Sequence, residues 1–103
     1  MIYVEDNIVL QPCKFGAFLE LENGLAGFLK GTRIKHIASW HTTVGNQGEI
    51  TVLYSCDDMG TWERAVSDLV QNKEFMVVYQ KALGLAASTN RKIMMPTPAS
   101  PLK

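Results

Sequence analysis

Apolar and polar residues alternate along two neighbouring segments near the middle of the chain, Ile34–Thr43 and Ile50–Cys56. A period of two is typical of β-strands, because successive side chains point to opposite faces of a sheet. The six residues between the segments are rich in glycine and asparagine, which favour an exposed turn. We therefore predict a β-hairpin around which the rest of the chain is arranged.

Two further segments have the character of strands, Ile2–Leu10 at the start of the chain and Leu85–Met95 near its end. In the first segment, three apolar residues and Asp6 share one face. A carboxylate on a mostly apolar face needs a partner or a cavity, unless it lies solvated at the rim of the sheet. The sequence leaves both alternatives for Asp6, a paired or cavity-facing carboxylate and a solvated one at the rim.

Helical spacing of apolar residues marks the two remaining stretches. Cys13–Leu29 carries an apolar stripe that is interrupted by Glu22 and ends before Gly31. Asp57 and Asp58 are suited to cap a second helix, whose apolar positions run to Val70 and restart beyond Asn72. The predicted order is thus strand, helix, strand, strand, helix, strand.

This order predicts an α+β fold, the ferredoxin-like βαββαβ layout with a four-stranded antiparallel sheet and helices on one face. A chain of 103 residues forms one domain, 1–103, in which 95–103 is an extended proline-rich tail. Apolar residues occur on both faces of the predicted strands, so the face away from the helices also needs a cover. We predict a homodimer in which two sheets pair into a barrel.

Charge and cysteine content exclude several classes of protein. Ten basic and ten acidic residues are scattered without a basic run, which argues against binding to nucleic acid or to an anionic membrane. No apolar run is long enough to span a bilayer, and the acidic N-terminus does not resemble a signal peptide. Two distant cysteines, Cys13 and Cys56, fit reduced thiols and a cytoplasmic location.

Four segments resemble the NIPSNAP-like proteins of the dimeric α/β-barrel superfamily. The most specific is Asn90–Leu102, which looks like that family's last strand followed by Pro-Thr-Pro-x-Ser-Pro-Leu. The others are Ser39–Gly45, Tyr54–Met59 and Ile2–Pro12. The resemblance implies the same fold, and a superfamily that includes cofactor-independent monooxygenases, isomerases, cyclases, haem enzymes and proteins without shown activity.

The chain departs from the family pattern at polar positions. Where the family opening carries glutamate, arginine and tyrosine, this chain has Val4, Asp6 and Ile8. The aromatic pair of the third strand is here Tyr54 and Cys56. We therefore expect a polar lining of its own, and a ligand that the resemblance does not identify.

Strict alternation places His36 and Trp40 on one face of the second strand and His41 on the other. Histidine near its ordinary pKa can take or give a proton at neutral pH, and tryptophan provides a flat wall for an aromatic molecule. His36 and Trp40 are otherwise ordinary core or edge residues. Two histidines on opposite faces cannot readily share a metal ion, so we expect no metal and no cofactor.

The function expected from these residues is that of a small-molecule enzyme acting by acid–base chemistry on an apolar or aromatic substrate, such as cyclisation, dehydration or oxygenation in polyketide-type tailoring. The alternative is a non-catalytic binding or scaffold homodimer. The candidates for proton transfer are His36, His41 and Asp6, and those for substrate binding are Trp40, Tyr54, Trp62 and Arg64. His41 could instead lie in a dimer interface, and Arg64 could be a solvated surface residue.

Overall fold

A computed structural model describes residues 1–102 and contains four strands and three helices. In chain order these are β1 (Ile2–Leu10), α1 (Phe15–Leu29), β2 (Lys35–His41), β3 (Glu49–Cys56), α2 (Met59–Gln71), α3 (Lys73–Gly84) and β4 (Ala86–Met94). The predicted order is confirmed, except that two helices, α2 and α3, occupy the place of the second predicted helix. Residues 95–102 form no helix or strand, and the last residue of the expected tail, 103, lies outside the described residues.

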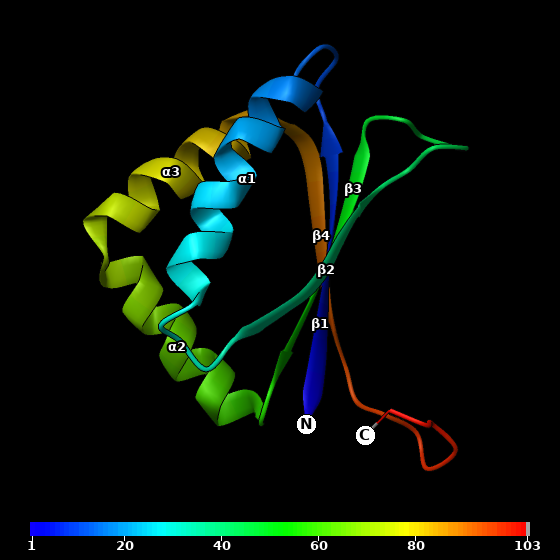
Figure 1. The fold of residues 1–103 in the computed structure, drawn as a ribbon, viewed down its shortest axis with the longest axis vertical. Helices are drawn as coiled ribbons and strands as arrows, with labels where there is room; N and C mark the ends of the chain where they lie inside the picture. The colour runs from blue at the N-terminus through cyan, green and yellow to red at the C-terminus, as the bar shows by residue number, and fades with distance from the viewer. Residues whose placement is uncertain (103) are drawn as a thin grey trace.

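The four strands form one antiparallel sheet in the order β2-β3-β1-β4, and all three helices lie on one side of it (Figure 1). This is the predicted ferredoxin-like arrangement. β1 occupies the inside of the sheet and pairs with β3 on one side and with β4 on the other. Residues from the first and last strands therefore become direct neighbours, and Asp6 of β1 stands opposite Arg91 of β4.

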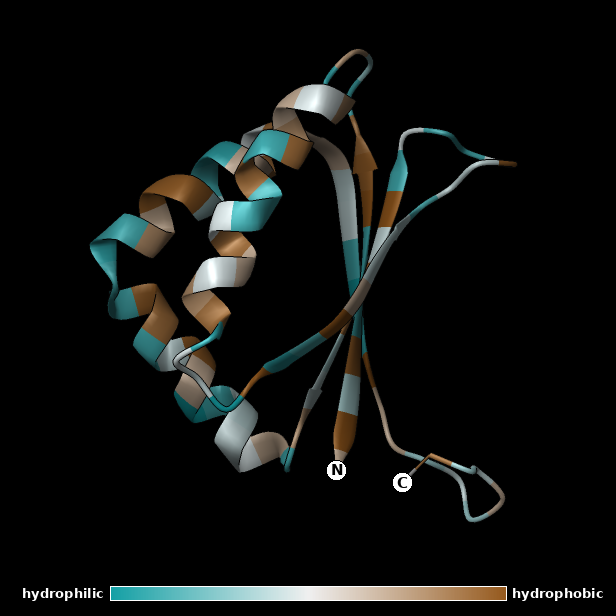
Figure 2. Cartoon of the chain, viewed as in Figure 1, coloured by the Kyte–Doolittle hydropathy of each residue, from teal (hydrophilic) through white to brown (hydrophobic). Residues whose placement is uncertain are grey.

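Side chains from the helix-facing side of the sheet and from the helices form two adjoining groups of buried residues. Val4 is fully buried and packs with Trp62 and Leu69 of α2, while Ile50 packs with Phe18 of α1. Figure 2 shows hydrophobic and hydrophilic positions interleaved along each helix, as expected for helices with one covered side. The apolar faces predicted for β1 and β3 are thus the ones that meet the helices.

Side-chain caps fix where two of the helices begin. The Asp58 carboxylate accepts a hydrogen bond from the backbone N–H of Thr61 at 2.7 Å, and this bond holds the pKa of Asp58 below its ordinary value. The Asn72 side chain accepts from the N–H groups of Glu74 and Phe75 at 3.0 and 3.2 Å. Asn72 therefore both separates α2 from α3 and starts α3.

A β-bulge in β2 corrects the predicted faces of that strand. His36 lies opposite Tyr54, Ala38 lies opposite Leu53, and the register shifts by one residue between His36 and Ala38. Beyond the shift His41 lies opposite the buried Ile50, so the prediction that the two histidines occupy opposite faces is wrong. Strict alternation failed because the bulge places two successive residues on the outer face.

The outer face of the sheet is uncovered in the single chain. Ile37 and Trp40 are 47% and 55% exposed there, so the prediction that Trp40 shares a face with His36 is also wrong. Among residues 1–102, no helix is both long and apolar enough to cross a membrane.

Candidate functional site

A cavity of about 160 Å³ lies between the helix-facing side of the sheet and the three helices. Most of its wall is apolar, with side chains such as Phe18, Leu25 and Phe75. Ionisable side chains reach it from the sheet and from two helices: Asp6, Glu22, His36, Tyr54, Tyr79 and Arg91. An apolar hollow with a few converging polar groups is the usual form of a small-molecule site.

Asp6 and Arg91 form a two-pronged ion pair in the wall of this cavity. They stand opposite each other on β1 and β4, and Arg91 donates from Nε and Nη2 to the two carboxylate oxygens at 2.6 and 2.8 Å. The hydrogen bonds to Asp6 raise the pKa of the Arg91 guanidinium. The Asp6 side chain is 14% exposed and has a partner, so Asp6 is not a solvated carboxylate at the rim of the sheet.

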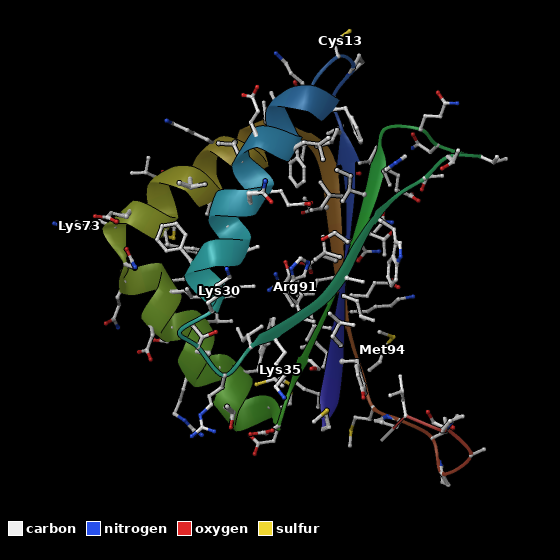
Figure 3. The ribbon with its side chains drawn as sticks, viewed as in Figure 1. Cys13, Lys30, Lys35, Lys73, Arg91 and Met94 are labelled. Carbon is white, nitrogen blue, oxygen red and sulfur yellow. The ribbon has the colours of Figure 1, made fainter. Side chains whose placement is uncertain are left out.

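Arg91 also meets an aromatic ring. Its guanidinium carbon lies 5.3 Å from the centroid of the Trp62 ring, within the range of a cation–π contact. Figure 3 shows Arg91 on the helix-facing side of the sheet, whereas Met94 of the same strand projects from the other side. The pairing with Asp6 and the contact with Trp62 together hold the guanidinium at the cavity wall.

Tyr54 stands between His36 and Trp62 on the cavity floor, with ring centroids 5.8 and 6.2 Å away, respectively. Burial raises the pKa of the Tyr54 phenol well above its ordinary value, and the negative charges of Asp6 and Glu22 raise it further against the opposing charge of Arg91. The phenol therefore stays protonated at neutral pH and can donate a hydrogen bond to a bound molecule.

His36 lies at the exposed sheet edge of the cavity and interacts with a residue from the other side of the bulge. Its Nε2 is 2.7 Å from Oγ of Ser39, which lines the cavity as well. The bulge brings these two side chains to the same face, although their spacing of three would place them on opposite faces of a regular strand. An imidazole in this position can accept a proton from a molecule in the cavity or donate one to it.

Glu22 brings a carboxyl group to the cavity from α1. Its Oε2 is buried and has no hydrogen-bond partner among residues 1–102. Burying a carboxyl oxygen without a partner costs free energy, so such atoms are rare in folded proteins. Sequence reasoning did not propose Glu22 as a site residue, although the signal was visible as the one charged position within an apolar helical stripe.

The structure brings together four of the seven residues proposed from the sequence. Asp6, His36, Tyr54 and Trp62 line the cavity. Sequence reasoning missed Arg91, although it indicated that Asp6 needed a partner or a cavity. That partner became visible only once β1 and β4 were paired.

The other three proposed residues lie elsewhere. Trp40 is on the outer face of the sheet. His41 is on the helix-facing side but packs edge-on against Phe15, with ring centroids 5.6 Å apart. Arg64 is exposed on α2 and donates to Oγ1 of Thr61 at 3.3 Å.

Metal-binding side chains do not gather in this fold. Within the described part of the chain, no group of three or more histidine, cysteine, aspartate or glutamate side chains is placed to hold an ion. The ionisable groups that converge on the cavity are instead of mixed kind: two carboxyl groups, one imidazole, two phenols and one guanidinium. Such a set can donate, accept and hold protons.

The fold and cavity define a ferredoxin-like α+β domain with a small-molecule-sized hollow under its helices. The NIPSNAP family model matches residues 9–101, and the chain belongs to the NIPSNAP family. No curated protein sequence matches it significantly.

Solved structures agree with this assignment. A NIPSNAP family protein from Agrobacterium tumefaciens is 18% identical, with a TM-score of 0.85 over 99% of this chain and 98% of that one. A NIPSNAP domain protein from Burkholderia xenovorans is 12% identical, with a TM-score of 0.86 over 98% and 99%. A putative antibiotic biosynthesis monooxygenase from Nitrosomonas europaea is 7% identical, with a TM-score of 0.74 over 93% and 98%. At these identities the likeness shows a shared fold.

Proposed function

We propose that this protein is an enzyme that binds an apolar or aromatic small molecule in the cavity and moves a proton on it without a cofactor. The observation that carries the proposal is the convergence of His36, Tyr54 and the Asp6–Arg91 pair on one apolar hollow. A base, a neutral donor and a fixed cation are the groups needed to form and hold an enolate. A substrate of about one ring matches the cavity volume.

In the proposed reaction, His36 removes a proton from the carbon next to a carbonyl group, and the C–H electron pair moves onto the carbonyl oxygen. Tyr54 donates a hydrogen bond to that oxygen, and Arg91, held in place by Asp6, stabilises its negative charge. The imidazolium of His36 then returns the proton at the same carbon or to a departing hydroxyl group. Cyclisation or dehydration of a polyketide-type substrate fits this chemistry, and an enolate is also the electron-rich species that dioxygen oxidises.

Exchange of carbon-bound protons tests the proposal without knowledge of the natural substrate. Acetophenone in D₂O, followed by NMR, should lose its methyl protons faster with the protein than in buffer. His36→Ala should slow the catalysed exchange about 100-fold, the usual contribution of a positioned base. The control is Lys35→Ala, an exposed neighbour that does not line the cavity. Equal rates for His36→Ala and the unsubstituted protein would contradict the proposal.

A second candidate is a non-catalytic binding or scaffold protein, and one observation favours it. The outer sheet face exposes Ile37 and Trp40, and the tail exposes Met95 and Leu102. Apolar surface of this kind suits contact with another protein chain. Ligand binding in the cavity without any proton exchange, for every ketone tested, would support this candidate over the enzyme.

A further inference from the structure

The carboxyl group of Glu22, whose Oε2 is buried without a hydrogen-bond partner in the described residues, has no part in the proposed reaction. It comes from α1, on the helix side, whereas His36, Tyr54 and Arg91 come from the sheet. The negative charge of Glu22 acts on Tyr54, as expected of two groups that face the same space. The question is what this carboxyl group contacts when the cavity is filled.

Charge balance among the residues that line the cavity leaves Glu22 without a counter-ion. The one guanidinium, Arg91, already donates two hydrogen bonds to Asp6. Lys and additional Arg side chains are absent from the described lining. An unpaired carboxyl group in an apolar wall disfavours a second carboxylate, and it favours a molecule that brings a hydrogen-bond donor.

We infer that the ligand of this cavity is a ring-sized apolar molecule with a hydroxyl group that donates to the Glu22 carboxylate. A hydroxyl group is favoured over an ammonium group because the surrounding wall is apolar, and removing a charged amine from water costs far more than removing a hydroxyl. The two oxygens of a glutamate carboxylate are chemically equivalent, so either one can accept the bond. The inference rests on the proposed use of the cavity as a ligand site.

Anchoring at Glu22 also fixes the orientation of the ligand. A hydroxyl group held at α1 directs the opposite end of the molecule toward the sheet, where Tyr54 and Arg91 lie. A phenol or enol carrying a carbonyl group on its far side would then present that carbonyl to the donor and the cation. Glu22 is accordingly a specificity-determining residue, and the sheet residues carry the chemistry.

The binding test uses probes that match in shape and differ in the donor. p-Cresol and 4-fluorotoluene are nearly the same size, and only p-cresol donates a hydrogen bond. The unsubstituted protein should bind p-cresol about 10- to 100-fold more tightly by calorimetry, the effect of a hydrogen bond to a charged group. Glu22→Leu should abolish this preference, while Glu20→Leu, an exposed change on the same helix, should leave it intact.

Thermal stability distinguishes a ligand-binding Glu22 from one that stabilises the fold. Removing a side chain that stabilises the fold would lower the Tm. Because Oε2 is buried without a partner, Glu22→Leu should raise the Tm of the ligand-free protein by about 5 °C. Glu22→Gln should keep the fold and lower the preference for p-cresol in part, since its amide oxygen still accepts.

Three results would overturn the inference: a preference for p-cresol that survives in Glu22→Leu, a Tm that falls in that variant, or tighter binding of 4-methylbenzylamine than of p-cresol. None of these measurements depends on turnover. The two proposals can therefore fail separately. If the preference for p-cresol depends on Glu22 but His36→Ala exchanges protons as fast as the unsubstituted protein, the ligand class is retained and the proposed reaction is rejected.

Discussion

Arg91 and Lys92 are consecutive residues of β4, and each forms an ion pair with a residue of β1, yet their surroundings differ. Arg91 bonds to Asp6 in the cavity wall, and Lys92 lies 3.3 Å from Glu5 on the outer face, with 64% of its side chain exposed. An ion pair in water contributes little, whereas a shielded carboxylate depends on its partner. The two positions therefore allow a matched comparison on one strand.

We predict that Arg91→Met destabilises the protein by about 1–2 kcal/mol, because Asp6 loses its counter-charge while the partial exposure of Arg91 limits the cost. Lys92→Met should change stability by less than about 0.5 kcal/mol. Urea unfolding measures both. Adding Asp6→Asn to Arg91→Met should recover part of the loss, since no charge is then left unpaired. Equal effects of the two single changes would show that the pair in the wall is no more than a surface contact.

The chemistry of individual residues could be predicted from the sequence only where a pattern made the residue unusual. Asp6 was recognisable because it interrupts an apolar strand face, and its need for a partner was foreseen. Arg91 was not identified, because an arginine near the end of a chain resembles any solvated cation until the strand pairing is known. Glu22 interrupts an apolar stripe in the same way as Asp6, and the helix alone does not show that the carboxyl group meets a cavity.

At the scale of elements, α2 and α3 show how one side chain divides a long helical stretch. The apolar stripe of α2 stops at Val70 and a second stripe begins in α3, and Asn72 turns the backbone away from helical geometry between them. Its side chain then accepts two backbone N–H groups that have no partner within α3. The boundary was predictable because asparagine is a poor helix-interior residue and a good cap.

Removal of this cap is a direct test of the boundary. Asn72→Ala should lower the free energy of unfolding by about 1 kcal/mol, because two N–H groups at the start of α3 lose their acceptor. The comparison is Gln71→Ala, an exposed position at the end of α2 where alanine suits the helix. Chemical denaturation with circular dichroism measures both. If the two variants are equally stable, the Asn72 side chain does not stabilise the start of α3.

The strands were predictable in number and extent, and the bulge in β2 was not. β1 and β3 alternate regularly, so their helix-facing residues were assigned correctly. In β2 the segment His36–Trp40 contains no glycine or proline that would mark an irregularity. The sequence has the pattern of a regular strand, and only the pairing with β3 shows that Ser39 and His41 share the helix-facing side with His36.

For the whole molecule, the main asymmetry is between the two faces of the sheet. Three helices cover one face (Figure 1), and the other face carries the exposed side chains of Ile37 and Trp40. Exposed apolar side chains on a sheet face that no helix covers make this face a candidate surface for association. The homodimer expected from the sequence remains a proposal, and this face is where we place it.

We predict that light scattering gives twice the mass of one chain at micromolar concentration, and that Trp40→Glu gives a single-chain mass. A charge at a desolvated position in an interface should oppose association strongly. Val44→Glu is the control, because Val44 is 93% exposed in the turn between β2 and β3. A single-chain mass for the unsubstituted protein would remove the proposed dimer, and the cavity under the helices would be unaffected.

The bulge between His36 and Ala38 also bears on how relatives with this fold can diverge. An insertion or deletion of one residue elsewhere in β2 would move the bulge along the strand. Between the old and the new position of the bulge, side chains that face the helices would then face outward, and the outward ones would face the helices. Ser39 and His41 would then leave the helix-facing side and Trp40 would move to it, with no amino acid replaced. A single-codon insertion or deletion could thus give a new binding preference in one evolutionary step, while the scaffold stayed the same.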